Sequence, residues 1–343
     1  TFRKKPKKNR AGHASQPYRK VLVTGGAGFI GSHMVDALLA DKTVVRVVCV
    51  DNFDASLYDP KLKEQNVAAH RKNKKYALYR ADIRDAKRMR AIFKKEKPDA
   101  VVHLAAKADT RNAVEEPFTY VETNVYGTLN ILECAREFGV KKIIFASSSS
   151  VYGNKNEAPF SEDVRADFPL SPYGATKRAG EILAHTYHHN FQIPIVCVRI
   201  FNAYGERMRP TLVLAKWTDK VFKGEEIEIS GAGTRARDYT YVGDLVEAFF
   251  RMLNAPISYE VINVGNTNPV SLTDLLQTLE AASGIKARVR SVRSHPASVE
   301  LTHASIERAK RVLGWRPRTS FEEGVKRYVL WFRNRSKNGP QPR

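Results

Sequence analysis

Tyr173 and Lys177 are the two residues whose types and spacing most directly suggest chemistry. Tyr173 directly precedes a segment with helical spacing, residues 174–187, that contains Lys177, and as positions i and i+4 the two would share one face of a helix. An ammonium group beside a phenol favours the phenolate and lowers the phenol's pKa from its usual value of about 10. Tyr173 is therefore a candidate general base near neutral pH. Because such a pair also arises by chance, its meaning depends on the surrounding segments.

A run of four serines, Ser147 to Ser150, precedes this pair and follows an apolar segment, residues 142–146, that predicts a strand. The carboxyl ends of strands in an open parallel sheet face the ligand crevice. Hydroxyl groups at that edge can donate hydrogen bonds to a sugar and accept them from it. We interpret the serines as candidate sugar-binding groups. The alternative is a polar loop without a ligand, since serine clusters are common in loops.

A glycine-rich turn lies between an apolar run and a helical pattern near the start of the chain. These three segments are residues 21–23, 24–31 and 34–39. Gly25 permits a tight turn, Gly28 lets the backbone approach a pyrophosphate, and Gly31 lets the helix pack closely on the strand. Phe29 and Ile30 open the helix, whose free N–H groups and positive dipole end would face the phosphates. Strand, turn and helix in this order are the context that a dinucleotide site requires.

An acidic residue follows the next predicted strand at the position expected for ribose binding. The apolar run of residues 44–50 ends at Asp51, 20 residues after Gly31, and Asn52 follows it. A carboxylate at this place accepts hydrogen bonds from an adenosine ribose and repels a 2′-phosphate. The sequence therefore predicts an NAD site rather than an NADP site. The alternative is a glycine-rich turn that binds no ligand.

Strand-like segments rich in β-branched residues alternate with segments of helical spacing. The predicted strands are residues 21–24, 44–50, 76–79, 100–104, 142–146, 194–200 and 260–264. The predicted helices between them are residues 34–39, 86–94, 120–138 and 174–187. This alternation predicts an α/β fold with a doubly wound parallel sheet of the Rossmann type.

Beyond about residue 205 the pattern loosens and predicts a second, smaller substrate-binding domain. We assign residues 20–204 to the NAD-binding domain, residues 236–266 to a stretch that crosses back to its sheet, and residues 205–235 and 267–333 to the second domain. Ser271 with Asp274 predicts the start of a helix over residues 271–282, and residues 321–333 predict the last helix. We expect a disordered basic tail over residues 1–19 and a frayed tail over residues 334–343.

The chain carries a formal net charge of +21, and eight of its first 20 residues are Lys or Arg. A basic arm could contact nucleic acid or an anionic membrane. No nucleic-acid-binding module accompanies the charge, so we expect a solvating tail and no specific nucleic-acid partner. No apolar run is long enough to span a bilayer. An anionic nucleotide substrate would also be attracted to such a protein.

Three scattered cysteines, Cys49, Cys134 and Cys197, argue against a disulfide framework and for a reducing, cytoplasmic compartment. The sequence begins at Thr1 rather than Met, which leaves an upstream signal or anchor open. His188 and His189 lie side by side at a predicted helix end, and no His/Cys cluster has metal-ligand spacing. We therefore expect no metal.

The motifs in this order resemble the NAD-dependent sugar-nucleotide epimerase/dehydratase family, the extended short-chain dehydrogenase/reductases. The likeness covers about residues 20–333. It rests on the glycine-rich turn, Asp51, Asp82-Ile83, His103-Leu104-Ala105-Ala106, Asn124, the serine run, Tyr173 with Lys177, Arg199-Ile200-Phe201-Asn202, and Arg237-Asp238-Tyr239-Thr240-Tyr241-Val242.

The resemblance implies a role for each of these positions. Tyr173 would be the base, Lys177 would orient it and hold the nicotinamide ribose, and Ser148 would bind the reacting sugar hydroxyl. The residues implied to contact NAD, besides Tyr173 and Lys177, are Gly25, Gly28, Phe29, Ile30, Gly31, Asp51, Asn52, Asp82, Ile83, Leu104, Ala105, Ala106, Asn124 and Phe201. The residues implied to contact a UDP-sugar are Arg111, Ser149, Ser150, Asn202, Arg209 and Arg237.

The same resemblance implies the reaction. Dehydratases and decarboxylases of the family carry acids in the loop before Val151-Tyr152-Gly153, where this chain has Ser149 and Ser150. Without an acid there, the implied chemistry is epimerisation at C4. Tyr173 would take the 4-hydroxyl proton while a hydride moves from C4 to NAD, and the hydride would return to the other face of the 4-keto sugar.

Several segments resemble the UDP-glucuronate 4-epimerase branch of the family. They are Asp51-Asn52-Phe53, Tyr58-Asp59-Pro60, Leu62-Lys63, Phe145 to Ser150, Arg111 and Arg209-Pro210. An Arg facing the C6 carboxylate of the sugar is physically reasonable. Helices over residues 120–138 and 174–187 resemble the family's dimer-forming bundle, which implies a homodimer.

Some positions depart from that branch. Asn202 stands where Thr is more usual, Lys107 and Asp109 stand where Gln and Gly are usual, and residues 295–298 and Ser305 lack an expected Asp. These departures keep UDP-glucose 4-epimerase open as an alternative. UDP-glucuronate decarboxylase is a further alternative, as is a noncatalytic NAD-binding protein whose tail contacts nucleic acid or a membrane.

Overall fold

The computed structural model of the protein describes residues 18–154, 157–292 and 300–338. The basic tail predicted for residues 1–19 lies almost wholly outside these ranges, as do residues 295–298.

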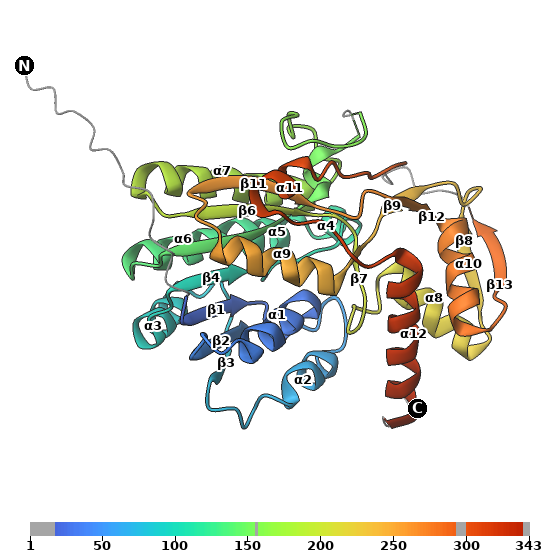
Figure 1. The fold of residues 1–343 in the computed structure, drawn as a ribbon, viewed down its shortest axis with the longest axis horizontal. Coiled ribbons are helices and arrows are strands. Elements are labelled where there is room, and N and C mark those ends of the chain that lie inside the picture. The colour runs from blue at the N-terminus through green and yellow to red at the C-terminus, as the bar shows by residue number, and fades with distance from the viewer. Residues whose placement is uncertain (1–17, 155–156, 293–299, 339–343) are drawn as a thin grey trace, which may run out of the picture.

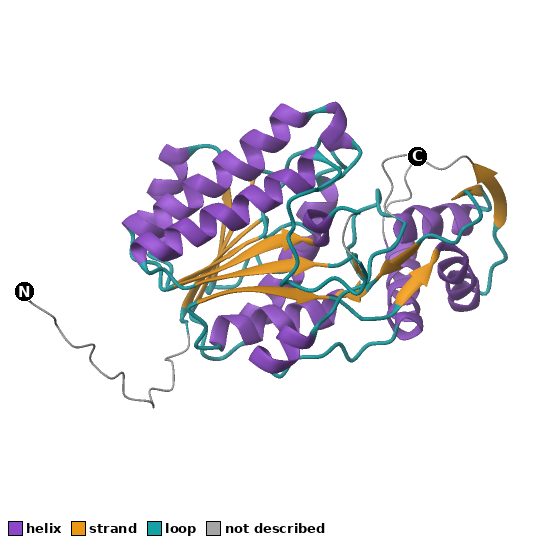
Figure 2. Ribbon diagram, turned by 90° about the horizontal axis from the view of Figure 1, so that it is seen from above, coloured by secondary structure: helices purple, strands orange, loops and turns teal. Residues whose placement is uncertain are grey.

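A seven-stranded parallel sheet forms the centre of the larger lobe, as Figures 1 and 2 show. Its strands, in spatial order, are β11 (Tyr259–Val264), β6 (Ile195–Ile200), β5 (Lys142–Ser148), β4 (Ala100–His103), β1 (Lys20–Thr24), β2 (Arg46–Asp51) and β3 (Tyr76–Arg80). The chain runs outward from β1 to β3 and then returns to β4 on the other side of β1. Ligands bind outside the carboxyl ends of the strands at such a reversal. The predicted doubly wound fold is confirmed.

Helices cover both faces of this sheet. One face carries α1 (Phe29–Ala40), α9 (Val242–Asn254) and α11 (Glu307–Leu313), and the other carries α3 (Ala86–Glu96), α6 (Gly127–Glu137) and α7 (Pro172–Phe191). Successive side chains of a strand point to opposite faces. Val21 and Val23 of β1 therefore join one hydrophobic core, whereas Leu22 joins the other. Burial on both faces explains why the strands are almost continuously apolar.

The helix predicted over residues 120–138 is interrupted. It consists of α5 (Pro117–Val121), a π-helical turn η1 (Glu122–Tyr126), and α6. The turn contains Asn124, which is buried and bonds to the neighbouring loop and to α7. π-Bulges inside helices occur frequently at functional sites.

A smaller lobe packs beside the carboxyl ends of the sheet strands (Figure 2). It contains α8 (Val213–Lys223), α10 (Leu272–Ser283) and α12 (Phe321–Asn338), and two short strand pairs. The pairs are β8 (Glu226–Ser230) with β13 (Arg288–Val292), and β9 (Ala236–Asp238) with β12 (Pro269–Ser271). The predicted helix start at Ser271 is a capping box, in which Ser271 and Asp274 bond to each other's backbone N–H groups.

We predicted a frayed tail from residue 334, and α12 continues into this part of the chain as far as Asn338. Arg335 holds this last turn in place: its guanidinium donates to Gln65 at 2.7 Å and lies 5.3 Å from the ring centroid of Trp331. Gln65 belongs to α2 (Lys61–Ala68), so the end of α12 reaches a helix of the larger lobe.

Several short elements escaped prediction. They are α2, α4 (Asn112–Glu115), α8, α11, β7 (Ala203–Tyr204) and β10 (Thr240–Tyr241), together with the short strands of the smaller lobe. None of the helices in the described ranges is long and apolar enough to cross a bilayer. The three cysteines are buried and free.

Candidate active site

A cavity of about 470 Å³ opens at the carboxyl ends of the sheet strands and extends to the smaller lobe. Most residues implied for cofactor and substrate line it. They are Gly25, Gly28, Phe29, Ile30, Gly31, Asp51, Asn52, Ile83, Leu104, Ala105, Ala106, Ser148, Ser149, Ser150, Tyr173, Lys177, Asn202 and Arg209. Five implied residues lie outside the lining: Asp82, Arg111, Asn124, Phe201 and Arg237.

The glycine turn has the close approaches that a phosphate cradle needs. Gly25 has φ +67°, and a Cβ atom there would lie 2.8 Å from the backbone nitrogen of Ala105. A Cβ atom at Gly31 would lie 2.0 Å from the carbonyl oxygen of Gly25, so helix and turn touch through their backbones. The first N–H groups of α1 have no partner within the helix. The turn therefore fits a dinucleotide diphosphate.

Asp51 lies at the end of β2 and is almost fully buried. Its Oδ1 accepts hydrogen bonds from Phe53 N at 2.9 Å and from Lys63 Nζ at 3.0 Å, while its Oδ2 accepts from Ala27 N at 3.2 Å. Lys63 comes from α2 and also lines the cavity. The sequence matched Lys63 to a family segment but gave no sign of this ion pair.

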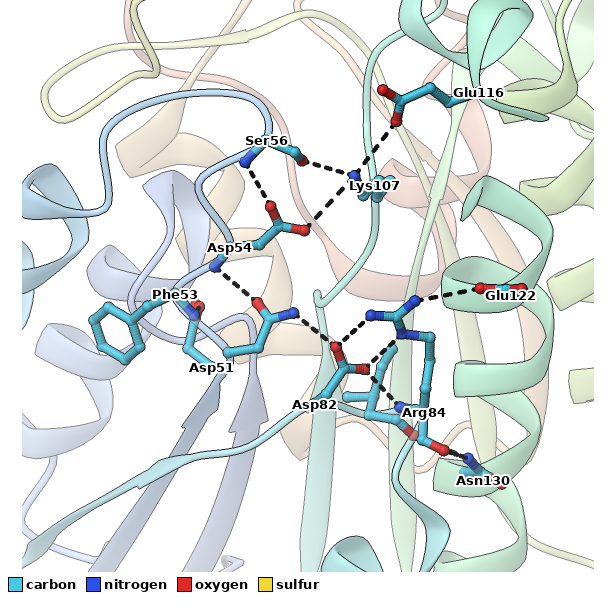
Figure 3. A network of polar contacts seen from close by, with 12 residues as sticks. Asp51, Phe53, Asp54, Ser56, Asp82, Arg84, Lys107, Glu116, Glu122 and Asn130 are labelled. Carbon is cyan, nitrogen blue, oxygen red and sulfur yellow. Dashed lines mark hydrogen bonds and ion pairs between the residues drawn. The ribbon is translucent and has the colours of Figure 1, made fainter. Parts of the chain in front are cut away.

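Asp82 lies beside the lining, where its neighbour Ile83 contributes directly. The Asp82 carboxylate accepts hydrogen bonds from Asn52 Nδ2 at 2.9 Å and from both Nε and Nη2 of Arg84 (Figure 3). Burial alone would raise the pKa of Asp82, but the bonds from Arg84 and Asn52 lower it to about 2. Asp82 is therefore a charged anchor that fixes the amide of Asn52 at the cavity.

Tyr173 lies in the first turn of α7, which Ser171 caps by accepting from Gly174 N at 3.2 Å. Ser148 ends β5, and its side chain lies in the same cavity as Tyr173, close enough to lower the pKa of that phenol. Burial raises the pKa of Tyr173, while Ser148 and the charge of Arg209 lower it. Strand and helix thus bring together the base and the hydroxyl that the sequence assigned.

Lys177 lies one turn further along α7 and is buried. Its Nζ donates to the carbonyl oxygen of Ala146 at 2.7 Å and lies 5.3 Å from the ring centroid of Phe145. Burial lowers the pKa of Lys177 to about 7, and the charge of Glu181 opposes this shift. In this structure the Lys177 ammonium donates to Ala146, and burial of the phenol makes the net shift of the Tyr173 pKa upward.

Glu181, which sequence reasoning missed, binds the strand that carries the serine run. It accepts from Ser147 Oγ at 2.6 Å and forms two bonds with the Arg199 guanidinium, at 2.8 and 2.9 Å. Both Glu181 and Arg199 are buried. The only signal in the sequence was the i, i+4 spacing from Lys177 to Glu181. The pair holds the strand that carries the serine run.

Arg209 places a cation at the sugar end of the cavity. Its charge lowers the pKa of Tyr58, Tyr120 and Tyr173, although burial raises the pKa of each phenol by more. Its guanidinium forms no hydrogen bond or ion pair with any residue that the structure describes. A partly buried cation without a counter-ion suits an anionic ligand.

The four other implied residues outside the lining are Asn124, Phe201, Arg111 and Arg237, and three of them contact other parts of the protein. Asn124 binds the backbone of Lys107, and Phe201 is buried in the core beside the Tyr152 ring, 6.2 Å between centroids. Arg111 is exposed at the N-terminus of α4. Arg237 on β9 donates to the carbonyl oxygens of Ala236 and Glu300. Within the described residues, no cluster of three or more His, Cys, Asp or Glu side chains could hold a metal ion.

The fold, the glycine turn and the Ser148–Tyr173 pair define a dinucleotide-binding protein with an acid–base pair in its pocket. The family model described as GDP-mannose 4,6-dehydratase matches residues 22–328. A UDP-glucuronate 4-epimerase of Thermodesulfobacterium geofontis is 40% identical over 311 residues, which cover 90% of this chain and 95% of that protein. The chain belongs to the NAD-dependent sugar-nucleotide epimerase/dehydratase family.

Two solved structures are closely similar to the whole fold. The UDP-glucuronic acid 4-epimerase of Bacillus cereus, in complex with UDP-glucuronic acid and NAD, has a TM-score of 0.86 at 35% identity and covers 92% of this chain and 99% of its own. The UDP-glucose 4-epimerase of Thermotoga maritima, with UDP-glucose, has a TM-score of 0.85 at 33% identity with the same coverage.

Proposed function

We propose that the protein is an NAD-dependent 4-epimerase of a UDP-sugar and interconverts UDP-glucuronate and UDP-galacturonate. The observation that carries this proposal is one cavity that holds Ser148, Tyr173, the glycine turn and the guanidinium of Arg209, which has no counter-ion among the described residues. The UDP-glucuronate 4-epimerases similar to this chain support the choice of sugar.

The residues of the cavity divide the chemistry between them. The glycine turn and Asp51 would hold NAD, which would supply a hydride acceptor for C4 of the sugar. Tyr173 takes up the proton of the sugar's 4-hydroxyl group and later returns it. The hydroxyl group of Ser148 forms a hydrogen bond to the same 4-hydroxyl group. Lys177 binds the Ala146 carbonyl in β5, next to the serine run. The family resemblance also assigns Lys177 to the nicotinamide ribose.

A carboxylate on the sugar makes a special demand on the pocket. The 4-keto form of a glucuronate is a β-keto acid, which loses carbon dioxide readily because the ketone stabilises the resulting carbanion. We infer that Arg209 holds the carboxylate in an orientation that prevents this loss, with Ser149 and Ser150 as further donors. Serines at these positions also disfavour a decarboxylase, for which the family uses an acid.

The protein is proposed to act as a homodimer through α5 and α7. Large apolar side chains on this surface are exposed: Phe118 of α5 is 84% exposed, and Val121, Tyr126 and Ile182 are about half exposed. Exposed apolar clusters of this kind mark interaction sites. Phe118→Asp should convert the dimer into monomers in light scattering, whereas the exposed Leu330→Asp on α12 should not.

One assay decides between the candidate functions. The purified protein is incubated with UDP-glucuronate, UDP-glucose and UDP-xylose, and C4 epimers are sought by NMR. Formation of UDP-galacturonate supports the proposal. UDP-galactose alone would favour the glucose epimerase, which the Thermotoga maritima structure also supports, and UDP-xylose formed from UDP-glucuronate would favour the decarboxylase. Bound NAD without turnover of any sugar would favour the noncatalytic alternative.

Two further assignments remain proposals. The division into an NAD-binding domain and a substrate-binding domain would be tested by limited proteolysis with and without NAD. The cytoplasmic location expected from the free cysteines would be tested by cell fractionation.

A further inference from the structure

Lys107 is a buried cation that the proposed reaction does not use. It follows β4, lines the cavity and is 8% exposed. Asn124 fixes its backbone on both sides: Asn124 Oδ1 accepts from Lys107 N at 2.8 Å, and Asn124 Nδ2 donates to Lys107 O at 2.9 Å. The backbone of Lys107 is therefore anchored to the π-helical turn, which contains Asn124.

The ammonium group of Lys107 reaches across to a different loop. Its Nζ donates to Ser56 Oγ at 2.7 Å and lies 3.6 Å from an oxygen of Asp54 (Figure 3). It also lies 3.8 Å from an oxygen of Glu116, between α4 and α5. Ser56 and Asp54 belong to the segment after β2. One cation thus links the segments that follow β2 and β4.

These two segments are opposite walls of the same cavity. From the first segment, Asn52, Asp54, Ser56, Leu57 and Tyr58 line it. From the second, Leu104, Ala105, Ala106, Lys107, Ala108, Asp109 and Thr110 line it. β1 lies between β2 and β4 in the sheet, so the link spans the strand whose glycine turn would hold the diphosphate.

The first wall keeps its shape through its own hydrogen bonds. Asn52 Oδ1 accepts from Asp54 N at 3.1 Å, and Asp54 Oδ1 accepts from Ser56 N at 2.6 Å. Lys107 also lowers the pKa of Asp54, although burial of that carboxyl opposes the shift. Without the ammonium, two carboxylates, Asp54 and Glu116, would face each other and drive the walls apart. When the contacts of the Lys107 ammonium break, the two walls can therefore move apart.

We propose that Lys107 is a strap that closes the cavity over NAD and slows both its entry and its release. The proposal rests on the NAD-dependent function proposed above. An epimerase restores its cofactor in every catalytic cycle and has no need to exchange it, so a slow-opening strap costs it no turnover. A protein that released reduced cofactor after each turnover would be limited by such a strap.

The strap predicts the same direction of change for two separate rates. The variants Lys107→Gln and Lys107→Met are compared with the holoenzyme, with Lys286→Gln as a matched control. Lys286 forms a 2.7 Å ion pair with Glu280 on α10, and neither residue lines the cavity. Release is measured as exchange of bound NAD for deuterated NAD by native mass spectrometry. Uptake is measured from NADH fluorescence after the protein has been stripped with charcoal.

We expect Lys107→Met to raise both rates by about tenfold or more, Lys107→Gln to raise them less, and the control to leave them unchanged. Faster release with unchanged uptake would make Lys107 a direct cofactor contact and would overturn the strap. Unchanged rates in both variants would overturn it as well. These rates require no turnover, so a protein that binds NAD but epimerises nothing would refute the proposed function and still test the strap.

A second variant protects the test against misfolding. Ser56 is exposed, so Ser56→Ala should fold normally, and it removes the hydrogen bond by which Lys107 reaches the opposite wall. We expect it to raise both rates by about two- to threefold, the scale of one lost hydrogen bond. Rates equal to those of the unmodified protein, with Lys107→Met unfolded, would overturn the strap.

Discussion

Lys63 Nζ donates to Asp51 Oδ1 at 3.0 Å, inside the cavity in which the adenosine ribose is expected. Because Phe53 N occupies the same oxygen, Oδ1 has no acceptor capacity left. Among the described residues, Oδ2 accepts from Ala27 N alone, which leaves it one lone pair. The pair thus presents one acceptor and one nearby cation to the ribose, so the choice between NAD and NADP depends on both residues.

The first prediction concerns this pair. Asp51→Ala removes the acceptor and leaves Lys63 without its counter-ion, where it can attract a 2′-phosphate. NADH should bind more weakly and NADPH more tightly, so that the affinity ratio shifts by about tenfold or more. Fluorescence titration with both nucleotides measures the ratio. Asp51→Ala combined with Lys63→Met is the control and should lose the gain for NADPH. Equal use of NAD and NADP by the unmodified protein would contradict the assignment of Asp51.

The second prediction concerns the base. Tyr173→Phe keeps the ring and removes the proton acceptor, so epimerisation should fall by about 100-fold or more while the circular dichroism spectrum and NAD content stay unchanged. Tyr120→Phe is the matched control, because its ring meets that of Tyr173 edge-on at 6.4 Å but lies outside the cavity lining. Near-normal turnover by Tyr173→Phe would assign the proton transfer to another group.

The third prediction concerns the sugar carboxylate. Arg209→Ala should raise the KM for UDP-glucuronate by about tenfold or more over any change in the KM for UDP-glucose, because one charge-assisted contact is lost. Steady-state kinetics with both sugars measure the difference. Arg111→Ala, at an exposed position outside the lining, should change neither KM. An equal effect of Arg209→Ala on both sugars would rule out the glucuronate assignment.

The fourth prediction concerns His103, which lies buried beneath the cavity. Thr128 Oγ1 donates to the Asn124 carbonyl at 2.6 Å and can therefore accept from His103 Nε2–H, at 3.0 Å. Thr24 Oγ1 then donates to Nδ1 at 2.7 Å, so the neutral ring is fully paired. Burial, aided by the charge of Lys177, lowers the pKa of His103 to about 3.

Because this pKa lies below the unfolded value of about 6.5, the unfolded chain binds a proton between pH 6.5 and 3 that the folded chain does not. Stability should fall with decreasing pH across this window. The free energy of unfolding, measured with urea at several pH values, should change with pH more steeply than that of His103→Gln, by up to about 1.4 kcal/mol per pH unit. Identical slopes for the two proteins would show that His103 does not titrate in this way.

The parts of the fold that repeat a local pattern were predictable from the sequence. All seven strands of the main sheet were located, because their apolar, β-branched runs differ from the helical spacing of the segments between them. The glycine turn was recognisable because its backbone leaves no room for side chains at Gly25 and Gly31. By contrast, the π-helical turn was missed, since residues 120–138 have ordinary helical spacing.

The partners of the site residues were not predictable, because they depend on how separate elements pack. Lys107 meets Ser56 only once the sheet brings their loops together, and Lys63 meets Asp51 only once α2 packs beside the end of β2. The role of Arg237 at the substrate stays a prediction. Its motif matched the family, but the structure places it outside the cavity lining, where its side chain donates to backbone carbonyls. A motif gives the residue type and order, whereas contacts depend on the tertiary arrangement.

The edge strand β11 comes from the later part of the chain and pairs with β6 from Ile195↔Tyr259 to Ile200↔Val264. A ribosome delivers the chain in order, at about 5–20 residues per second. For several seconds, therefore, the nascent protein presents β6 as an open apolar edge on an otherwise assembled sheet. Such an edge can pair with any neighbouring strand. Codons that slow translation between β6 and β11 should therefore increase aggregation. A ribosome-associated chaperone should bind the nascent chain during this interval.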